Sequence, residues 1–143
     1  MENIHANIPG EEVKSRNVFR DRIDLLRSRA ELLTGKDKVL MTMYLKNGTS
    51  FRQMARLIGV NEASIARRIH KVTQRLIDGE YITCLRNRDK FTPTEMKVSK
   101  DYFLEGLSMK KIAKKRGLTY YRIRQTLKKI ERLIRIINRA KAG

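Results

Sequence analysis

The sequence repeats itself after 58 residues, and this repeat constrains the fold more than any other feature. When Gly59 is placed over Gly117, eight of the positions from 33 to 76 carry the same residue as their counterparts. The identical pairs are Thr34/Thr92, Tyr44/Tyr102, Gly48/Gly106, Ser50/Ser108, Ala55/Ala113, Gly59/Gly117, Ile65/Ile123 and Lys71/Lys129. A repeat of this kind indicates one supersecondary unit that occurs twice. A chain of 143 residues has room for two such small units.

Helix start and stop signals divide each copy into three helices. The segment TPTE at 92–95 can form a capping box with proline at the first helical position, and TGKD at 34–37 is a weaker version of it. Equivalent signals follow in both copies, namely Gly48 and Gly106, Ser50 and Ser108, Gly59 and Gly117, and Asn61 and Thr119. Two helices joined by a short turn with glycine are typical of a helix-turn-helix. We therefore expect an all-α fold with two tandem helix-turn-helix three-helix units, at 34–80 and 91–143.

The remaining segments lie outside the repeat. Residues 1–10 show no periodicity and predict a flexible tail. Residues 11–33 predict a helix that precedes the two units, because apolar residues recur there at spacings of three and four: Phe19, Ile23, Leu26, Ala30 and Leu33. This helix either supports the core, which is the commoner outcome, or joins two chains in a homodimer. Residues 81–90 are a linker, in which YITCL allows a short extended segment.

The charge of the chain is strongly positive and unevenly placed. There are 33 Lys and Arg against 15 Asp and Glu, a net charge of +18. Residues 1–32 are neutral, whereas residues 33–80 carry +5 and residues 91–143 carry +11. Such an excess predicts an anionic partner, bound through counterion release from a polyphosphate backbone or through attraction to anionic lipid. The repeated units therefore carry the anion-binding role.

The third helix of each copy presents a basic face opposite its apolar stripe. The stripes are Ile65, Ile69, Val72 and Leu76, and Ile123, Leu127, Ile130 and Ile134. The opposite faces hold no acidic residue and consist of Ala63, Ser64, Arg67, His70, Lys71 and Gln74, and of Tyr121, Arg122, Gln125, Lys128, Lys129 and Arg132. The DNA major groove admits one helix and offers base edges to such side chains. A single outer arginine is more simply a solvated residue, but the recurrence of the face in both copies favours DNA.

The spacing of Gly48, Ser50, Met54-Ala55, Gly59-Val60 and Ile65 resembles the fourth conserved region of bacterial sigma factors, a helix-turn-helix that reads the upstream promoter element. Together the two copies cover about 89 of the 143 residues. The resemblance implies that the third helices are recognition helices. The expected base-reading residues are Ser64, Arg67, Arg68, Lys71, Tyr121, Arg122, Gln125, Lys128 and Lys129. Basic residues on the second helices are placed for phosphates: Arg52, Arg56, Lys110, Lys111, Lys114 and Lys115.

Several other classes of protein do not fit the sequence. A complete sigma factor has an aromatic-rich region that melts the promoter, whereas residues 1–32 hold one Phe and neither Trp nor Tyr. No cofactor motif, metal motif or nucleophile with a neighbouring base occurs, so we expect no enzyme, no cofactor and no metal. The chain shows neither a secretory signal nor a membrane-spanning apolar run.

The sequence therefore predicts a sequence-specific, double-stranded DNA-binding transcription regulator of bacterial or phage type, cytoplasmic and associated with the nucleoid. Contact with RNA polymerase stays open at this stage. The alternative is a nonspecific protein that binds RNA or coats the nucleoid. Aromatic residues make up only 6% of the chain, which argues against RNA modules that read sequence by stacking bases.

Overall fold

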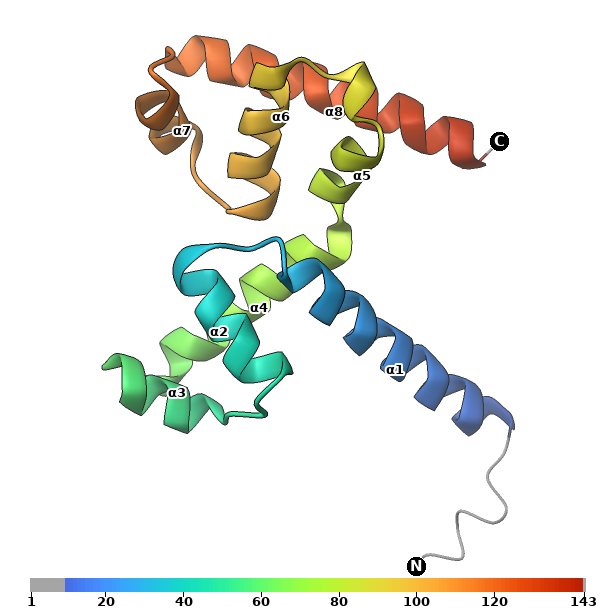
Figure 1. Cartoon of the computed structure of the whole chain (residues 1–143), viewed down its shortest axis with the longest axis vertical. Coiled ribbons are helices and arrows are strands. Elements are labelled where there is room, and N and C mark those ends of the chain that lie inside the picture. Colours follow the sequence, from blue (N-terminus) through green and yellow to red (C-terminus); the bar gives the residue numbers. More distant parts are fainter. Residues whose placement is uncertain (1–9, 143) are drawn as a thin grey trace, which may run out of the picture.

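The computed structural model describes residues 10–142, and every regular element within this range is a helix (Figure 1). The α-helices are α1 (Gly10–Ala30), α2 (Gly35–Leu45), α3 (Phe51–Ile58), α4 (Glu62–Asp78), α5 (Glu80–Arg86), α6 (Pro93–Ser99), α7 (Met109–Arg116) and α8 (Tyr120–Ala142). A 3-10 turn, η2 (Arg88–Lys90), precedes α6, and a π-helical segment, η3 (Lys100–Leu104), follows it. The expected all-α fold is confirmed. The predicted tail lies outside the described residues, except for Gly10.

Two hydrophobic cores organise the helices. The first is formed by α1 to α4, and the second by α5 to α8 with the segments between them. Both predicted stripes are buried in these cores, each residue at 5% exposure or less: Ile65, Ile69, Val72 and Leu76, and Ile123, Leu127, Ile130 and Ile134. We call α2 to α4 the first unit, and α6, η3, α7 and α8 the second unit. One residue crosses this division, because Leu104 of η3 is buried in the first core.

Most helix starts form as the capping residues predict. Thr34 is the exception, because its side chain makes no capping hydrogen bond at the start of α2 and its hydroxyl instead donates to Glu105 Oε2 at 3.1 Å. The Ser50 hydroxyl accepts the backbone N–H of Gln53, and the Gln53 side chain accepts the backbone N–H of Ser50. Thr92 and Glu95 form the same capping box at α6. Three further side chains accept backbone N–H groups at the starts of α4, α7 and α8, those of Asn61, Ser108 and Thr119. These bonds satisfy donors that a helix start leaves free.

Helix α1 supports the first unit with its carboxyl-terminal half. Leu26 and Leu33 are buried in the first core, but Phe19, expected on the same face, is 66% exposed. The amino-terminal half of α1 extends away from the other helices (Figure 1), which is why its apolar seam is only partly covered. Arg27 donates to the Leu45 carbonyl at the end of α2, at 3.0 Å. Cations are favourable at helix carboxyl termini, so this bond holds α1 to the unit.

The expected linker is helical, and the extended segment that YITCL allowed was wrong. Helix α5 follows α4 after a single residue, Gly79, which adopts a left-handed conformation with φ 64°. Arg29 of α1 donates to the carbonyls of Leu76 and Ile77 at this turn. The YITCL segment forms a helix because it has its own buried side: Cys84 is fully buried in the second core.

Candidate nucleic-acid interface

The basic face predicted for the first copy lies on the exposed side of α4. Ala63, Arg67, His70, Lys71 and Gln74 are exposed, and Ser64 is half-buried. Arg67 donates to the Ser64 hydroxyl at 3.3 Å. The face therefore presents cationic and hydrogen-bonding groups to solvent, as a helix that reads base edges requires.

The basic face of the second copy lies on α8 and is fully exposed. Its members are Tyr121, Arg122, Gln125, Lys128, Lys129 and Arg132. Tyr121 is 69% exposed and Tyr120, which precedes it, is 48% exposed. The two faces thus differ in side chains while the buried stripes beneath them are alike.

Two of the expected base-reading residues are held by acids of their own unit. Arg68 donates its Nε–H to Asp37 Oδ1 at 2.8 Å, and Lys129 Nζ lies 2.8 Å from Glu95 Oε2. Asp37 and Glu95 occupy equivalent positions of the repeat, and both are buried. Burial alone raises the pKa of Glu95, but hydrogen bonds from Lys129 and Thr92 outweigh it and lower the pKa. These pairs tie the third helix to the first helix of each unit.

The expected phosphate-contacting residues are exposed on α3 and α7. Arg52 lies 3.8 Å from Glu62, a long contact between exposed groups. Lys115 is different, because its Nζ lies 3.1 Å from Asp101, a buried carboxylate that also accepts two bonds from Arg116. Within the described part of the chain no ion pair involves the remaining four, Arg56, Lys110, Lys111 and Lys114.

Asp101 is a buried carboxylate that sequence reasoning did not single out. Burial alone raises the pKa of this carboxyl, but hydrogen bonds from Arg116 and Lys115 outweigh it, and the pKa falls below its usual range. Asp101 lies in the π-helical segment η3, whose counterpart in the first copy is regular helix. The repeat contains a signal for this residue, because Asp101 occupies the position equivalent to the apolar Met43 of the first copy. The ion pair fixes the end of α7 against η3.

The amino-terminal ends of the two third helices lie on one side of the molecule. In the view of Figure 1, α4 and α8 both begin at the left edge and run towards the right. Their preceding helices, α3 and α7, also lie on that side. The starts of both third helices, with the second helices before them, therefore lie on the same side of the molecule.

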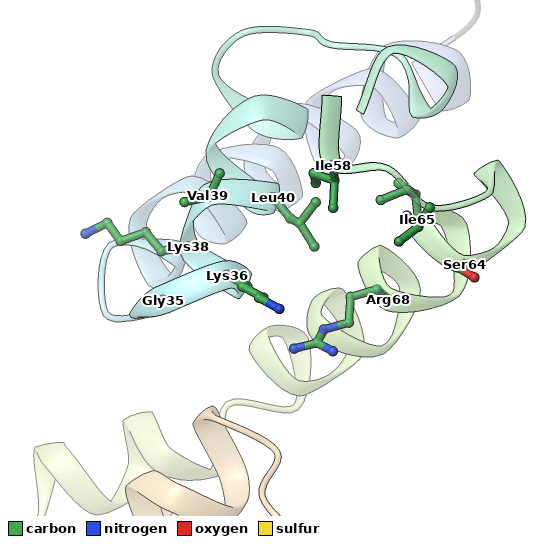
Figure 2. A pocket seen from close by; sticks show the side chains of 10 residues that line it. Gly35, Lys36, Lys38, Val39, Leu40, Ile58, Ser64, Ile65 and Arg68 are labelled. Atoms are coloured by element: carbon green, nitrogen blue, oxygen red, sulfur yellow. The ribbon is translucent and has the colours of Figure 1, made fainter. Parts of the chain in front are cut away.

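An apolar hollow is present on the first unit, beside the basic face of α4 (Figure 2). It has a volume of about 810 Å³ and is lined by Gly35, Lys36, Lys38, Val39, Leu40, Ile58, Val60, Ser64, Ile65 and Arg68. Val39 and Ile58 are 53% and 44% exposed. The second unit has Lys97 and Arg116 at the positions of these two residues, so the apolar surface belongs to one copy only.

Among the residues that the structure describes, no helix is long and apolar enough to cross a bilayer. In the same range, no group of three or more His, Cys, Asp or Glu side chains is arranged to hold a metal ion. Comparisons with protein-family models, with curated proteins and with solved structures give no match.

Proposed function

We propose that this protein is a sequence-specific, double-stranded DNA-binding transcription regulator that acts in the cytoplasm on the nucleoid. In this proposal α3–α4 and α7–α8 are two helix-turn-helix modules, and α4 and α8 enter major grooves of one duplex. The protein works by binding and carries out no reaction of its own. RNA polymerase is a second partner only if the regulator acts as an activator by direct contact.

One observation carries the proposal: the same exposed, basic and acid-free face occurs on α4 and on α8, above the same buried stripe. Both faces are basic as a whole, although only Lys71 and Lys129 place a Lys or Arg at the same repeat position, so the positive charge is kept while the individual side chains change. A groove-reading helix has a reason to keep this charge, because phosphates flank every base edge that it reads. The faces also differ where base contacts are expected, since Arg67 and His70 correspond to Gln125 and Lys128. Such differences allow two copies of one scaffold to read different bases.

Selection of duplexes from a random DNA library, followed by competition binding over a salt series, tests this function. A selected duplex should bind at least about a thousandfold more tightly than random duplex at physiological salt. RNA of the same length and anionic vesicles should compete no better than random DNA. Binding of all polyanions with one steep salt dependence and no selected sequence would instead indicate nonspecific coating.

A further inference from the structure

A polar cleft lies between the first and the second unit. It consists of two adjoining hollows of about 360 Å³ each, which share Asp37, Arg68, Glu105 and Leu107 in their walls. One wall comes from α2 and α4, and the other from η3, α7 and the loop between them. Neither unit forms this cleft by itself, so we call it the inter-unit cleft.

The inter-unit cleft is strongly basic. Nine Lys and Arg side chains and three carboxylates line it, which gives a net charge of +6. Two of the carboxylates are neutralised inside the protein, Asp37 by Arg68 and Arg75, and Asp101 by Lys115 and Arg116. The third, Glu105, accepts a hydrogen bond from the Thr34 hydroxyl.

Five of the lining cations form no ion pair with any residue that the structure describes. They are Lys36, Arg67, Lys71, Lys100 and Lys111. They come from both walls, and like charges gathered in one cleft repel one another unless an anion lies among them. A chain of phosphates is an anion of suitable form, since it offers one charge after another along a groove.

The walls of the cleft are joined at its base. Arg75 of α4 donates its Nε–H to the Leu104 carbonyl at 3.1 Å and its Nη2–H to Asp37 at 3.0 Å. Leu104 itself is buried in the first core. The cations on the two walls are therefore held at a fixed separation, as a site with defined spacing requires.

We propose that the inter-unit cleft binds consecutive phosphates of the DNA backbone, on the stretch of duplex between the two segments read by α4 and α8. This inference rests on the proposed function and extends it. Two recognition helices that enter successive grooves from one side must pass over the backbone between them. Lys36 and Lys100 then become phosphate contacts, although neither lies on a second or third helix of its unit. Lys111 contacts phosphate in both proposals, and Arg67 and Lys71 keep their base-reading role and line the cleft where it adjoins the basic face of α4.

The test compares two double variants that remove the same charge. Lys36→Ala with Lys100→Ala removes two lysines of the cleft, and Lys90→Ala with Lys97→Ala removes two lysines outside its lining. Binding is measured by fluorescence anisotropy over a salt series, with a selected duplex of about 30 bp, roughly three helical turns. Two half duplexes of about 10 bp, one helical turn each, carry one of the two read segments apiece and are measured in parallel. Thermal unfolding checks that both variants keep the stability of the wild type.

The cleft variant should bind the long duplex roughly tenfold more weakly, with a salt slope smaller by about 2, because each lost phosphate contact removes about 0.9 from the slope. Its binding to each half duplex, and all binding by the control variant, should stay within about twofold of the wild type. Equal losses for long and half duplexes, or for both variants, overturn the inference. If the wild type selects a duplex and the cleft variant binds it normally, the inference fails alone; if the wild type selects none, the proposed function fails with it.

Discussion

Arg75 on α4 donates its Nε–H to the backbone carbonyl of Leu104, 3.1 Å away in the second copy of the repeat. The same guanidinium donates to Asp37, so one side chain links two elements of the first unit to η3 of the second. The repeat position equivalent to Arg75 is Leu133, and a leucine cannot make such a bond. The contact between the units therefore depends on a residue that the two copies do not share.

Substitution of Gly106 should loosen this contact. Gly106 has φ 71°, and a Cβ atom there would lie 2.6 Å from the Arg75 guanidinium. We expect Gly106→Ala to lower the free energy of unfolding by about 2 kcal/mol, since it combines backbone strain with loss of a charged hydrogen bond. Chemical denaturation monitored by circular dichroism measures this change.

Gly117→Ala is the matched control for this prediction. Gly117 has nearly the same backbone conformation, φ 66°, but a Cβ atom there would have no neighbouring atom within 4 Å. It should cost only the backbone strain, about 1 kcal/mol. In an Arg75→Ala background, Gly106→Ala should lower the free energy of unfolding by no more than Gly117→Ala does. An unchanged difference between the two glycines in that background would show that Arg75 is not the obstructing group.

Asp101→Asn should destabilise the protein at neutral pH and make its free energy of unfolding less dependent on pH in the acidic range. The amide keeps the shape of the side chain but loses the charge that pairs with Arg116 and Lys115, and we expect a loss of roughly 2 kcal/mol. Because folding lowers the pKa of Asp101, its contribution is present above the usual pKa of an aspartate and is lost as the pH falls through the lowered value.

Urea unfolding of the wild type and of the Asp101→Asn variant measures this effect. The measurements run from about pH 2 to about pH 7, a range that covers the titration of carboxyl groups. The stability difference between the two proteins should shrink steadily below about pH 4. A difference that stays constant over the whole range would contradict a charged Asp101 in the folded state.

Cys84 should be unreactive in the folded protein. Burial raises the pKa of its thiol to about 11, although a hydrogen bond with Ser99 acts in the opposite direction. The thiolate is the reactive form, and little of it is present at about pH 8. The side chain is also fully buried, so a disulfide reagent has no access to it. We expect labelling to follow global unfolding, and to become fast in denaturant.

A Ser28→Cys variant supplies the comparison for Cys84. Ser28 lies at an exposed position on α1, so its replacement should react quickly under native conditions. The variant should therefore show one fast and one slow thiol. Two fast thiols would mean that α5 opens away from the second core without global unfolding.

Variants on α4 and α8 should separate base reading from phosphate contact. Arg67→Ala and Gln125→Ala should each change the preferred base at one part of the selected duplex, at a cost of about 1–3 kcal/mol for the original base. Lys114→Ala should weaken all duplexes alike and reduce the salt slope by about 1. Binding to a panel of single-base variants measures both effects, and uniform losses for all three substitutions would place the reading residues elsewhere.

The sequence was most informative where structure depends on local chemistry. The apolar stripes of α4 and α8 and most of the capping residues are predicted correctly, because each rests on side chains within a few positions of one another. The cap expected at Thr34 is wrong, because its hydroxyl donates to Glu105 of the second unit instead. The expectation failed at Phe19, which continues the spacing of α1 but lies beyond the reach of the first unit. Periodicity shows which side of a helix is apolar and does not show how much of that side a neighbour covers.

Contacts between segments far apart in the chain were decided by the tertiary structure. Arg68 and Lys129 were expected among the base-reading residues, and folding also pairs them with Asp37 and Glu95. A helical projection gives the direction of a side chain, but the partner that competes for it comes from a helix 31 or 34 residues away. The same reason hides the roles of Asp101 and Arg75, whose partners lie outside their own helices.

The sequence by itself therefore determined the repeat, the three helices of each copy, most of their caps and the two basic faces, since all of these follow from short-range spacing and composition. Only the tertiary structure decided how the two copies are joined, because that depends on Arg75 reaching a backbone carbonyl 29 residues away and on Leu104 filling a core other than its own. The inter-unit cleft exists for the same reason. Its walls meet only when the chain has folded, and no pattern within either copy contains it.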